Sequence, residues 1–259
     1  MTNSEPPPGA FNAAADPARR LLGGPPPWAQ LEAARRRSVP LRSVLEGIAT
    51  LGQFGPAPEG APQPDDPHAA WRRHLAAGWP TDGEPGGASA VLVPLFEEDG
   101  QARVLLTRRS AELRTHRGQV SFPGGRIDPG EDAAAGALRE ANEEIGIDPG
   151  AVEIVGWLHP LYTLNTTLIL PVVGVLAGRP ATTANPDEVA RVFDVTIAEL
   201  VGDDVYRSDV WDPYEAWSPA GTQRRELWFF DVEGERVWGA TARMLHELAL
   251  IALGLPIPT

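Results

Sequence analysis

The 259-residue sequence contains no cysteine, which excludes disulfide bonds, thiolate nucleophiles and cysteine-ligated zinc sites. It also contains no lysine, so all 22 strongly basic residues are arginine. No run of about 18 apolar residues is present, and no transmembrane helix is expected; the best stretch, residues 168–177, is interrupted by Pro171. Residues 1–9 lack the basic start and apolar run of a signal peptide, so we expect a cytoplasmic protein.

The overall charge narrows the classes of partner. The formal net charge is −13, with a sequence pI near 4.8. A phosphate backbone demands a basic surface, so this balance argues against nucleic-acid binding, and it also argues against a polybasic membrane anchor. Hydrophobic residues make up 42 % of the chain, which is enough for a sizeable core.

The N-terminal third has the composition of an extension. Residues 1–27 are rich in proline, glycine and alanine and predict a disordered segment. Short helices are expected over Trp28–Arg37, Leu41–Leu51 and Ala69–Ala77. Residues 1–87 therefore predict a partly helical extension, for which docking on the rest of the chain, dimerisation and partial disorder remain the alternatives. A homodimer is among the partners expected.

The pattern changes at Ala88, where a domain over residues 88–259 is expected. Residues Glu97–Gln101 separate the first two apolar runs and are expected to form a hairpin turn that contains Asp99 and Gly100. Strands interleaved with two helices predict an α/β (α+β) domain. The expected elements are strands at Ala88–Phe96, Ala102–Thr107, Val152–Leu158, Leu168–Leu176, Val189–Val195 and Glu226–Val232, and helices at Asp132–Ile145 and Ala240–Leu253.

Three glutamates lie on one side of the expected helix at Asp132–Ile145. At about 100° per residue, Glu140, Glu143 and Glu144 fall within one narrow arc, with apolar side chains on the other side. Like charges at this spacing repel one another, so a cation between them would be favourable. Carboxylate oxygens in this number suit Mg²⁺ or Mn²⁺. An acidic, solvated helix surface is the alternative interpretation.

The spacing of the wider segment resembles the signature of the Nudix hydrolases, Gly-x5-Glu-x7-Arg-Glu-apolar-x-Glu-Glu-x-Gly-apolar. Gly125, Glu131 and residues 139–147 fill every fixed position, with Ala141 as a small member of the apolar class. The resemblance implies a Nudix fold, in which a mixed β-sheet is sandwiched between helices. It also implies hydrolysis of a phosphoanhydride bond in a nucleotide-like substrate.

The resemblance assigns roles by position. Glu140 and Glu144 would be the principal ligands of Mg²⁺ or Mn²⁺, and Glu143 a further ligand, directly or through water. Arg139 and Glu131 would form a supporting pair that orients these carboxylates.

Further roles concern the backbone and the proton acceptor. Gly124 or Gly125 would let the backbone approach the metal or a phosphate closely. The general base varies across the family, and Glu140, Glu143 or a glutamate of a later loop would serve. Glu188 is the later-loop candidate, because it precedes an expected strand where relatives often offer such a residue. A loop acid without a role is the alternative for Glu188.

The segment upstream resembles the additional motif of the coenzyme A diphosphatase branch of the family. Residues 105–125 read LLTRRSAELRTHRGQVSFPGG, and the later run Trp238–Ala242 also looks like that branch. The resemblance spans about residues 88–254. It implies hydrolysis of coenzyme A or its thioesters to 4′-phosphopantetheine, or its acyl derivative, and adenosine 3′,5′-bisphosphate.

The charge of this segment supports an anionic substrate independently of the resemblance. Between residues 101 and 126, six arginines and the single acid Glu112 give a net charge of +5. Such a patch in an acidic protein attracts anions, and arginine binds phosphate with two parallel hydrogen bonds. Arg103 and Arg108 are the weakest candidates for substrate contact. The expected substrate contacts are Arg109, Arg114, His116, Gly124 and Gly125.

Some alternatives stay open. His116 would either contact phosphate or stabilise its loop by a hydrogen bond. Another Nudix substrate, such as ADP-ribose, a dinucleotide or a nucleoside triphosphate, is the second hypothesis for function. A non-catalytic nucleotide-binding module is the third, although such modules usually lose one or more of the helix glutamates, and all three are present here.

Overall fold

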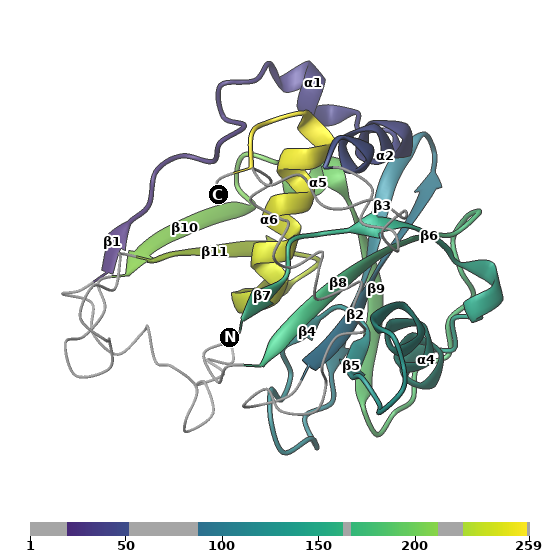
Figure 1. Ribbon diagram of the computed structural model, residues 1–259. Helices are drawn as coiled ribbons and strands as arrows, with labels where there is room; N and C mark the ends of the chain where they lie inside the picture. Colours follow the sequence, from purple (N-terminus) through teal and green to yellow (C-terminus); the bar gives the residue numbers. More distant parts are fainter. Residues whose placement is uncertain (1–19, 52–87, 163–166, 212–224, 258–259) are drawn as a thin grey trace, which may run out of the picture.

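The computed structural model describes residues 20–51, 88–162, 167–211 and 225–257 (Figure 1). Its main feature is an eight-stranded mixed sheet. The strands are β2 (Ala88–Glu98), β3 (Gln101–Arg109), β4 (Val120–Ser121), β5 (Gly124–Arg126), β6 (Glu153–Trp157), β7 (Leu161–Tyr162), β8 (Leu168–Val175) and β9 (Val189–Thr196). They pair in the order β4-β3-β2-β8-β6, while β5 pairs with β2, β7 with β8 and β9 with β3.

Strand β2 is central and has both faces buried. It runs parallel to β8 and antiparallel to β3 and β5. Leu92 and Phe96 pack into a core cluster on one face, whereas Val93 and Leu95 pack into the cluster on the other. A strand covered on both faces has an almost continuous apolar sequence, as Ala88–Phe96 does.

Helices cover both faces of this sheet, as Figure 1 shows. Helix α4 (Ala133–Ile145) packs on one face, and α2 (Leu41–Thr50) and α6 (Gly239–Leu253) belong to the core on the other. The predicted fold, a mixed sheet sandwiched between helices, is confirmed. In the described parts of the chain, no helix combines the length and the apolarity that a bilayer crossing requires.

The turn between β2 and β3 has the conformation that its sequence predicts. Glu98 pairs with Gln101, which leaves a two-residue loop. Asp99 and Gly100 have φ of 52° and 71°, the positive values that a type I′ turn requires at both positions. The predicted hairpin is therefore confirmed.

A second, four-stranded antiparallel sheet was largely missed by the sequence analysis. It has the order β1-β10-β11-β12, and only β11 was expected. Strand β10 carries Ser208 and Asp209 at its centre and therefore lacks an apolar pattern. The four strands are β1 (Arg20–Leu22), β10 (Tyr206–Trp211), β11 (Arg225–Val232) and β12 (Glu235–Val237).

The prediction of disorder over residues 1–27 is wrong for residues 20–27. Strand β1 pairs with β10, and the Gly23 amide donates to the Ser208 carbonyl at 2.8 Å. Composition cannot reveal this order, because the edge of β10, far away in the sequence, supplies the backbone partners. Residues 1–19 and the predicted helix at Ala69–Ala77 lie outside the described residues.

The N-terminal segment also caps two helices. Arg35, in α1 (Ala33–Arg37), donates to the Leu253 carbonyl at the end of α6 at 2.8 Å. Arg36 donates to the Val201 carbonyl, just after α5 (Ile197–Leu200), at 3.0 Å. Arginine at these positions satisfies carbonyls that a helix end leaves unpaired. Residues on both sides of the predicted boundary at residue 87 thus share one core.

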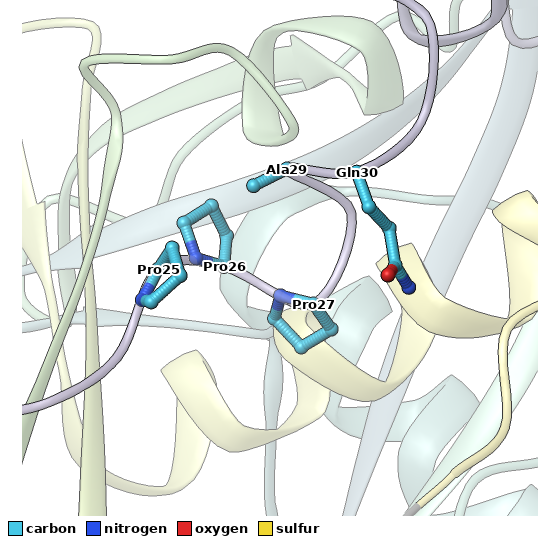
Figure 2. A pocket seen from close by; sticks show the side chains of 5 residues that line it. All are labelled: Pro25, Pro26, Pro27, Ala29 and Gln30. Carbon is cyan, nitrogen blue, oxygen red and sulfur yellow. The ribbon is translucent and has the colours of Figure 1, made fainter.

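Residues on both sides of Trp28 form a small surface hollow, shown in Figure 2. Its lining consists of Pro25, Pro26, Pro27, Ala29 and Gln30. None of the site residues predicted from the sequence lines it. The three prolines fix the backbone that leads to Trp28, whose indole is fully buried.

Replacing Trp28 tests whether this segment belongs to the folded core. The indole packs edge-on against Tyr206, with ring centres 5.0 Å apart, and also lies against Phe230 and His246. We expect Trp28→Ala to lower the free energy of unfolding by about 3–5 kcal/mol, the usual cost of truncating a buried large aromatic side chain. Gln30→Ala is the matched control, since Gln30 is exposed. Equal denaturant midpoints for the two variants would contradict the assignment.

Candidate functional site

Helix α4 has both ends fixed by local signals. The Asp132 carboxylate accepts a hydrogen bond from the Ala135 amide at 2.8 Å, which caps the N-terminus. Gly146 ends the helix in the left-handed conformation, with φ of 71°. Ala137, Ala141 and Ile145 are fully buried against the sheet. The rotation of the helix, and hence the placement of its glutamates, follows from this packing.

Glu144 is a buried carboxylate. The residue is 4 % exposed, and its Oε2 atom accepts a hydrogen bond from the Gly124 amide at 3.2 Å. Burial raises the pKa of Glu144 to about 7, although the Gly124 amide and the nearby Arg109 charge act in the opposite direction. The interpretation of this helix face as merely solvated is therefore wrong at Glu144.

Glu140 lies directly against the backbone of β5. Its side chain is 18 % exposed, and burial raises its pKa while Arg139 opposes the shift. A Cβ atom at Gly125 would lie 2.5 Å from the Glu140 carboxyl group. Only glycine allows this approach, because any side chain at residue 125 would push the carboxylate away.

The structure brings Arg139 and Glu131 together. Nε and Nη2 of Arg139 donate to the two Glu131 oxygens, each at 3.0 Å, which is a bidentate pair. This pairing lowers the pKa of Glu131. Nη1 of Arg139 also donates to Glu140 at 3.0 Å and to Glu143 at 3.2 Å, and Nη2 donates to the Arg126 carbonyl at 3.0 Å. One guanidinium group thus holds three glutamates in place.

Glu188 lies beside the glutamates of α4. The Asn185 amide donates to the Glu144 carbonyl at 2.8 Å, and the Glu188 carbonyl accepts from the Ser110 amide at 2.8 Å. The negative charge of Glu188 is close enough to raise the pKa of both Glu140 and Glu144. The predicted later-loop acid therefore lies near the carboxylates of the helix.

The predicted substrate contacts divide into two groups. Arg109 ends β3 beside Glu144, with its Nη1 atom 3.7 Å from the Glu144 Oε1 atom. Arg114 and His116 lie on the exposed segment between β3 and β4. The ring of His116 hydrogen-bonds the Gln119 side chain at 2.9 Å, so the loop-stabilising contact is present.

Besides Arg109, two of the six arginines of this segment have acidic partners elsewhere in the chain. Arg103 pairs with Asp194 at 2.5 Å, and Arg108 pairs with Glu235 at 3.2 Å. Both acids lie outside residues 101–126, so they compensate part of the +5 charge of that segment. These pairs agree with the expectation that Arg103 and Arg108 are the weakest candidates for substrate contact.

The donors at this site fit a hard divalent cation. Five carboxylates, those of residues 131, 140, 143, 144 and 188, face two guanidinium groups, those of residues 109 and 139. With every carboxyl group ionised, this group would carry three more negative than positive charges. Over the described ranges, no group of three His, Asp or Glu side chains is arranged to hold a metal ion. Arg139 hydrogen-bonds two of the α4 glutamates, Glu140 and Glu143. The oxygen donors and the Gly125 approach nonetheless suit Mg²⁺ or Mn²⁺.

Sequence reasoning did not predict the contact of Arg109 with Glu144, nor the Gly124 amide as the partner of Glu144. Both contacts join β3 or β5 to a helix face through the fold of the sheet. One indication for Arg109 was available from the sequence, its match to the upstream motif. That match implied a contact with substrate and did not identify Glu144 as a partner.

Solved structures with a similar fold include a MutT/nudix family protein from Enterococcus faecalis. That structure is 17 % identical with a TM-score of 0.40, and the match covers 66 % of this chain and 61 % of that protein. The Nudix hydrolase RenU from M. smegmatis is 21 % identical with a TM-score of 0.40, over 46 % of this chain and 82 % of RenU.

Sequence comparisons identify the family. The NUDIX domain model matches residues 87–214. The uncharacterized Nudix hydrolase NudL of Photorhabdus laumondii is 40 % identical over 162 residues, which cover 62 % of this chain and 82 % of NudL. Nudix hydrolase 22, chloroplastic, from Arabidopsis thaliana is 39 % identical over 65 % of this chain, which spans only 56 % of that relative. The chain therefore belongs to the Nudix hydrolase family.

Proposed function

We propose that the protein hydrolyses the diphosphate bond of coenzyme A or its thioesters, giving 4′-phosphopantetheine or its acyl derivative and adenosine 3′,5′-bisphosphate. The observation that carries the proposal is the position of Arg109. This residue belongs to the segment that resembles the coenzyme A diphosphatase motif, and its guanidinium group lies 3.7 Å from the buried Glu144 carboxylate. A substrate phosphate bound by Arg109 would thus lie beside the carboxylates.

Each residue has a role that follows from its position. Glu140 and Glu144, with Glu143 at the exposed edge, would hold Mg²⁺ or Mn²⁺. When bound, the cation would neutralise the diphosphate and lower the pKa of the attacking water. Arg139, fixed by Glu131, would keep Glu140 and Glu143 oriented.

The proton acceptor is proposed from the loop that faces the helix. Glu188 lies near Glu140 and Glu144, and its carbonyl is tied to the Ser110 amide. With its backbone held in this way, the Glu188 carboxylate would accept the proton of the attacking water. Glu143 is the second candidate for this role, because its side chain is 56 % exposed.

Recognition of coenzyme A is proposed to use the exposed basic segment. Arg109 would bind the diphosphate, and Arg114 and His116, on the segment after β3, would meet the 3′-phosphate. ADP-ribose, a dinucleotide or a nucleoside triphosphate, which lack that phosphate, are the alternative substrates.

A cytoplasmic location, a homodimer and the division into an extension (1–87) and a catalytic domain (88–259) also stay predictions.

The substrate proposal is tested with a panel of coenzyme A, dephospho-coenzyme A and ADP-ribose. We expect coenzyme A to have the highest kcat/KM, with loss of the 3′-phosphate costing about 1.5–3 kcal/mol, the usual worth of a charge-assisted hydrogen bond. Mass spectrometry in water labelled with oxygen-18 identifies the products and the phosphorus attacked. In Arg114→Ala the preference should shrink while the melting temperature stays unchanged. Equal kcat/KM for coenzyme A and its dephospho form in the wild type would refute the recognition of the 3′-phosphate.

The metal assignment is tested with Glu144→Gln. The variant should lower kcat/KM by about 10²–10³-fold, and chelation should abolish the wild-type activity. Glu153→Gln, an exposed glutamate on β6, is the control.

The pH dependence of protein stability provides an independent test of the burial of Glu144. Because burial raises its pKa from 4.5 to about 7, ionisation of this carboxyl group destabilises the metal-free fold. The contribution of the neutral acid is complete below pH 4.5 and is lost as the pH rises through 7. Glutamine has no such loss, so the melting temperature of Glu144→Gln should rise relative to wild type over this interval. A difference that is constant with pH would contradict the burial argument.

The close approach at β5 is tested with Gly125→Ala. The new Cβ atom would meet the Glu140 carboxyl group at 2.5 Å and displace it. We expect Mg²⁺ affinity, measured by calorimetry, to fall roughly tenfold or more. Gly178→Ala is the matched control, because nothing lies within 4 Å of a Cβ atom at that position. Unchanged Mg²⁺ affinity in a folded Gly125→Ala variant would remove Glu140 from the ligand set.

A further inference from the structure

Arg109 and Arg139 both face the glutamates of α4, but they differ in how far their hydrogen bonds are satisfied. Arg139 donates five hydrogen bonds, from all three guanidinium nitrogens. The guanidinium group of Arg109 has the ionic contact with Glu144 at 3.7 Å, which is beyond hydrogen-bond distance. Its Nε atom is buried and has no hydrogen-bond partner within the described part of the chain.

Hydrogen bonds fix the backbone around Arg109, so any reorientation of this residue involves its side chain. The Arg109 amide donates to the Gln119 carbonyl at 2.9 Å, and the Ser110 amide donates to the Glu188 carbonyl at 2.8 Å. The pairing of β3 with β9 shifts register between Arg108 and Arg109. Such irregularities commonly re-aim a side chain next to a functional site. The Arg109 side chain, 26 % exposed, therefore starts from a rigid base between buried Glu144 and solvent.

The surrounding charge explains why Arg109 rests on Glu144. The Glu144 carboxylate is 4 % exposed, and the carboxylates of Glu140 and Glu188 lie nearby. Arg139 binds the other α4 glutamates but has no hydrogen bond to Glu144 among those that the structure shows. Arg109 is thus the nearby cation for Glu144, and a divalent cation at this carboxylate would take over that role.

We propose that Arg109 is an exchangeable counter-ion: it pairs with Glu144 in the metal-free protein and turns to the diphosphate of the substrate once Glu144 is engaged by the divalent cation. The inference rests on the proposed function, since it assigns Glu144 to the cation. Arg109 then competes with the cation for Glu144 and binds the anion only after losing that competition. Because binding free energies are reciprocal, an anion on Arg109 also frees Glu144 for the cation. Cation and substrate therefore favour each other beyond their direct contact.

The test measures binding and does not depend on turnover or on the identity of the substrate. Mg²⁺ alone is titrated by calorimetry into the full chain at about pH 8.5, far above the usual titration range of a glutamate. Methylenediphosphonate, a diphosphate analogue that is not hydrolysed, is then titrated into the Mg²⁺-saturated protein. Failure to hydrolyse coenzyme A would refute the proposed substrate and leave these two measurements unaffected.

The variants separate competition from two simpler roles. Arg109→Gln should bind Mg²⁺ about 3- to 10-fold more tightly, because a positive charge next to the ligand is removed. It should bind methylenediphosphonate roughly tenfold more weakly, because the guanidinium fork is lost. Arg109→Lys keeps the charge without the fork, so Mg²⁺ affinity should stay near wild type while the anion binds more weakly. Arg108→Gln, whose arginine pairs with Glu235, is the control and should change neither affinity.

Other outcomes overturn the proposal. Unchanged Mg²⁺ affinity in Arg109→Gln with weaker anion binding would show that Arg109 serves the substrate alone. Weaker Mg²⁺ binding with a lower melting temperature in both Arg109 variants would show that the residue is structural.

Discussion

The site depends on the free-energy cost of keeping the Glu144 carboxylate away from water. A buried ionised carboxylate is unfavourable unless hydrogen bonds and opposite charges compensate it. Gly124 supplies one amide, and Arg109 supplies one charge at 3.7 Å. This compensation is incomplete, which is why the pKa of Glu144 rises to about 7. The fold thus stores an unfavourable charge at the position where the family signature predicts a metal ligand.

The packing of the sheet makes this burial unavoidable. Residues Ala137, Ala141 and Ile145 fix one side of α4 against the sheet, so Glu144, between the last two, cannot rotate into solvent without moving the helix. Strand β5 pairs with β2 through Gly124 and thereby brings its amide to the helix. The core and the site therefore depend on the same packing. Trp28 belongs to the core cluster on the opposite face of this sheet, where it contacts Tyr206 and Phe230 of the second sheet.

Features of the site that depend on local sequence could be predicted, and those that depend on distant partners could not. The limits of α4 follow from a capping aspartate and a terminating glycine, and its carboxylate arc follows from helical periodicity. Strand β5 has three residues, too few for a periodic pattern. The order of residues 20–27 required the edge of β10, and the contact of Arg109 with Glu144 required the sheet to bring β3 beside α4. No spacing rule encodes such contacts.

The two arginines of the site show how position decides the use of one residue type. Arg139 lies on α4 one residue before Glu140 and four before Glu143, and it also contacts Glu131. Its donors are therefore satisfied by residues close to it in the sequence. Arg109 sits at the end of a strand, where the nearest acid lies across the fold and beyond hydrogen-bond distance. The arrangement of Arg139 favours a rigid side chain, because moving it would leave several carboxylates without their hydrogen-bond partner. The arrangement of Arg109 leaves unsatisfied donors facing an anionic site, which is the condition for binding a further anion rather than for stabilising the fold.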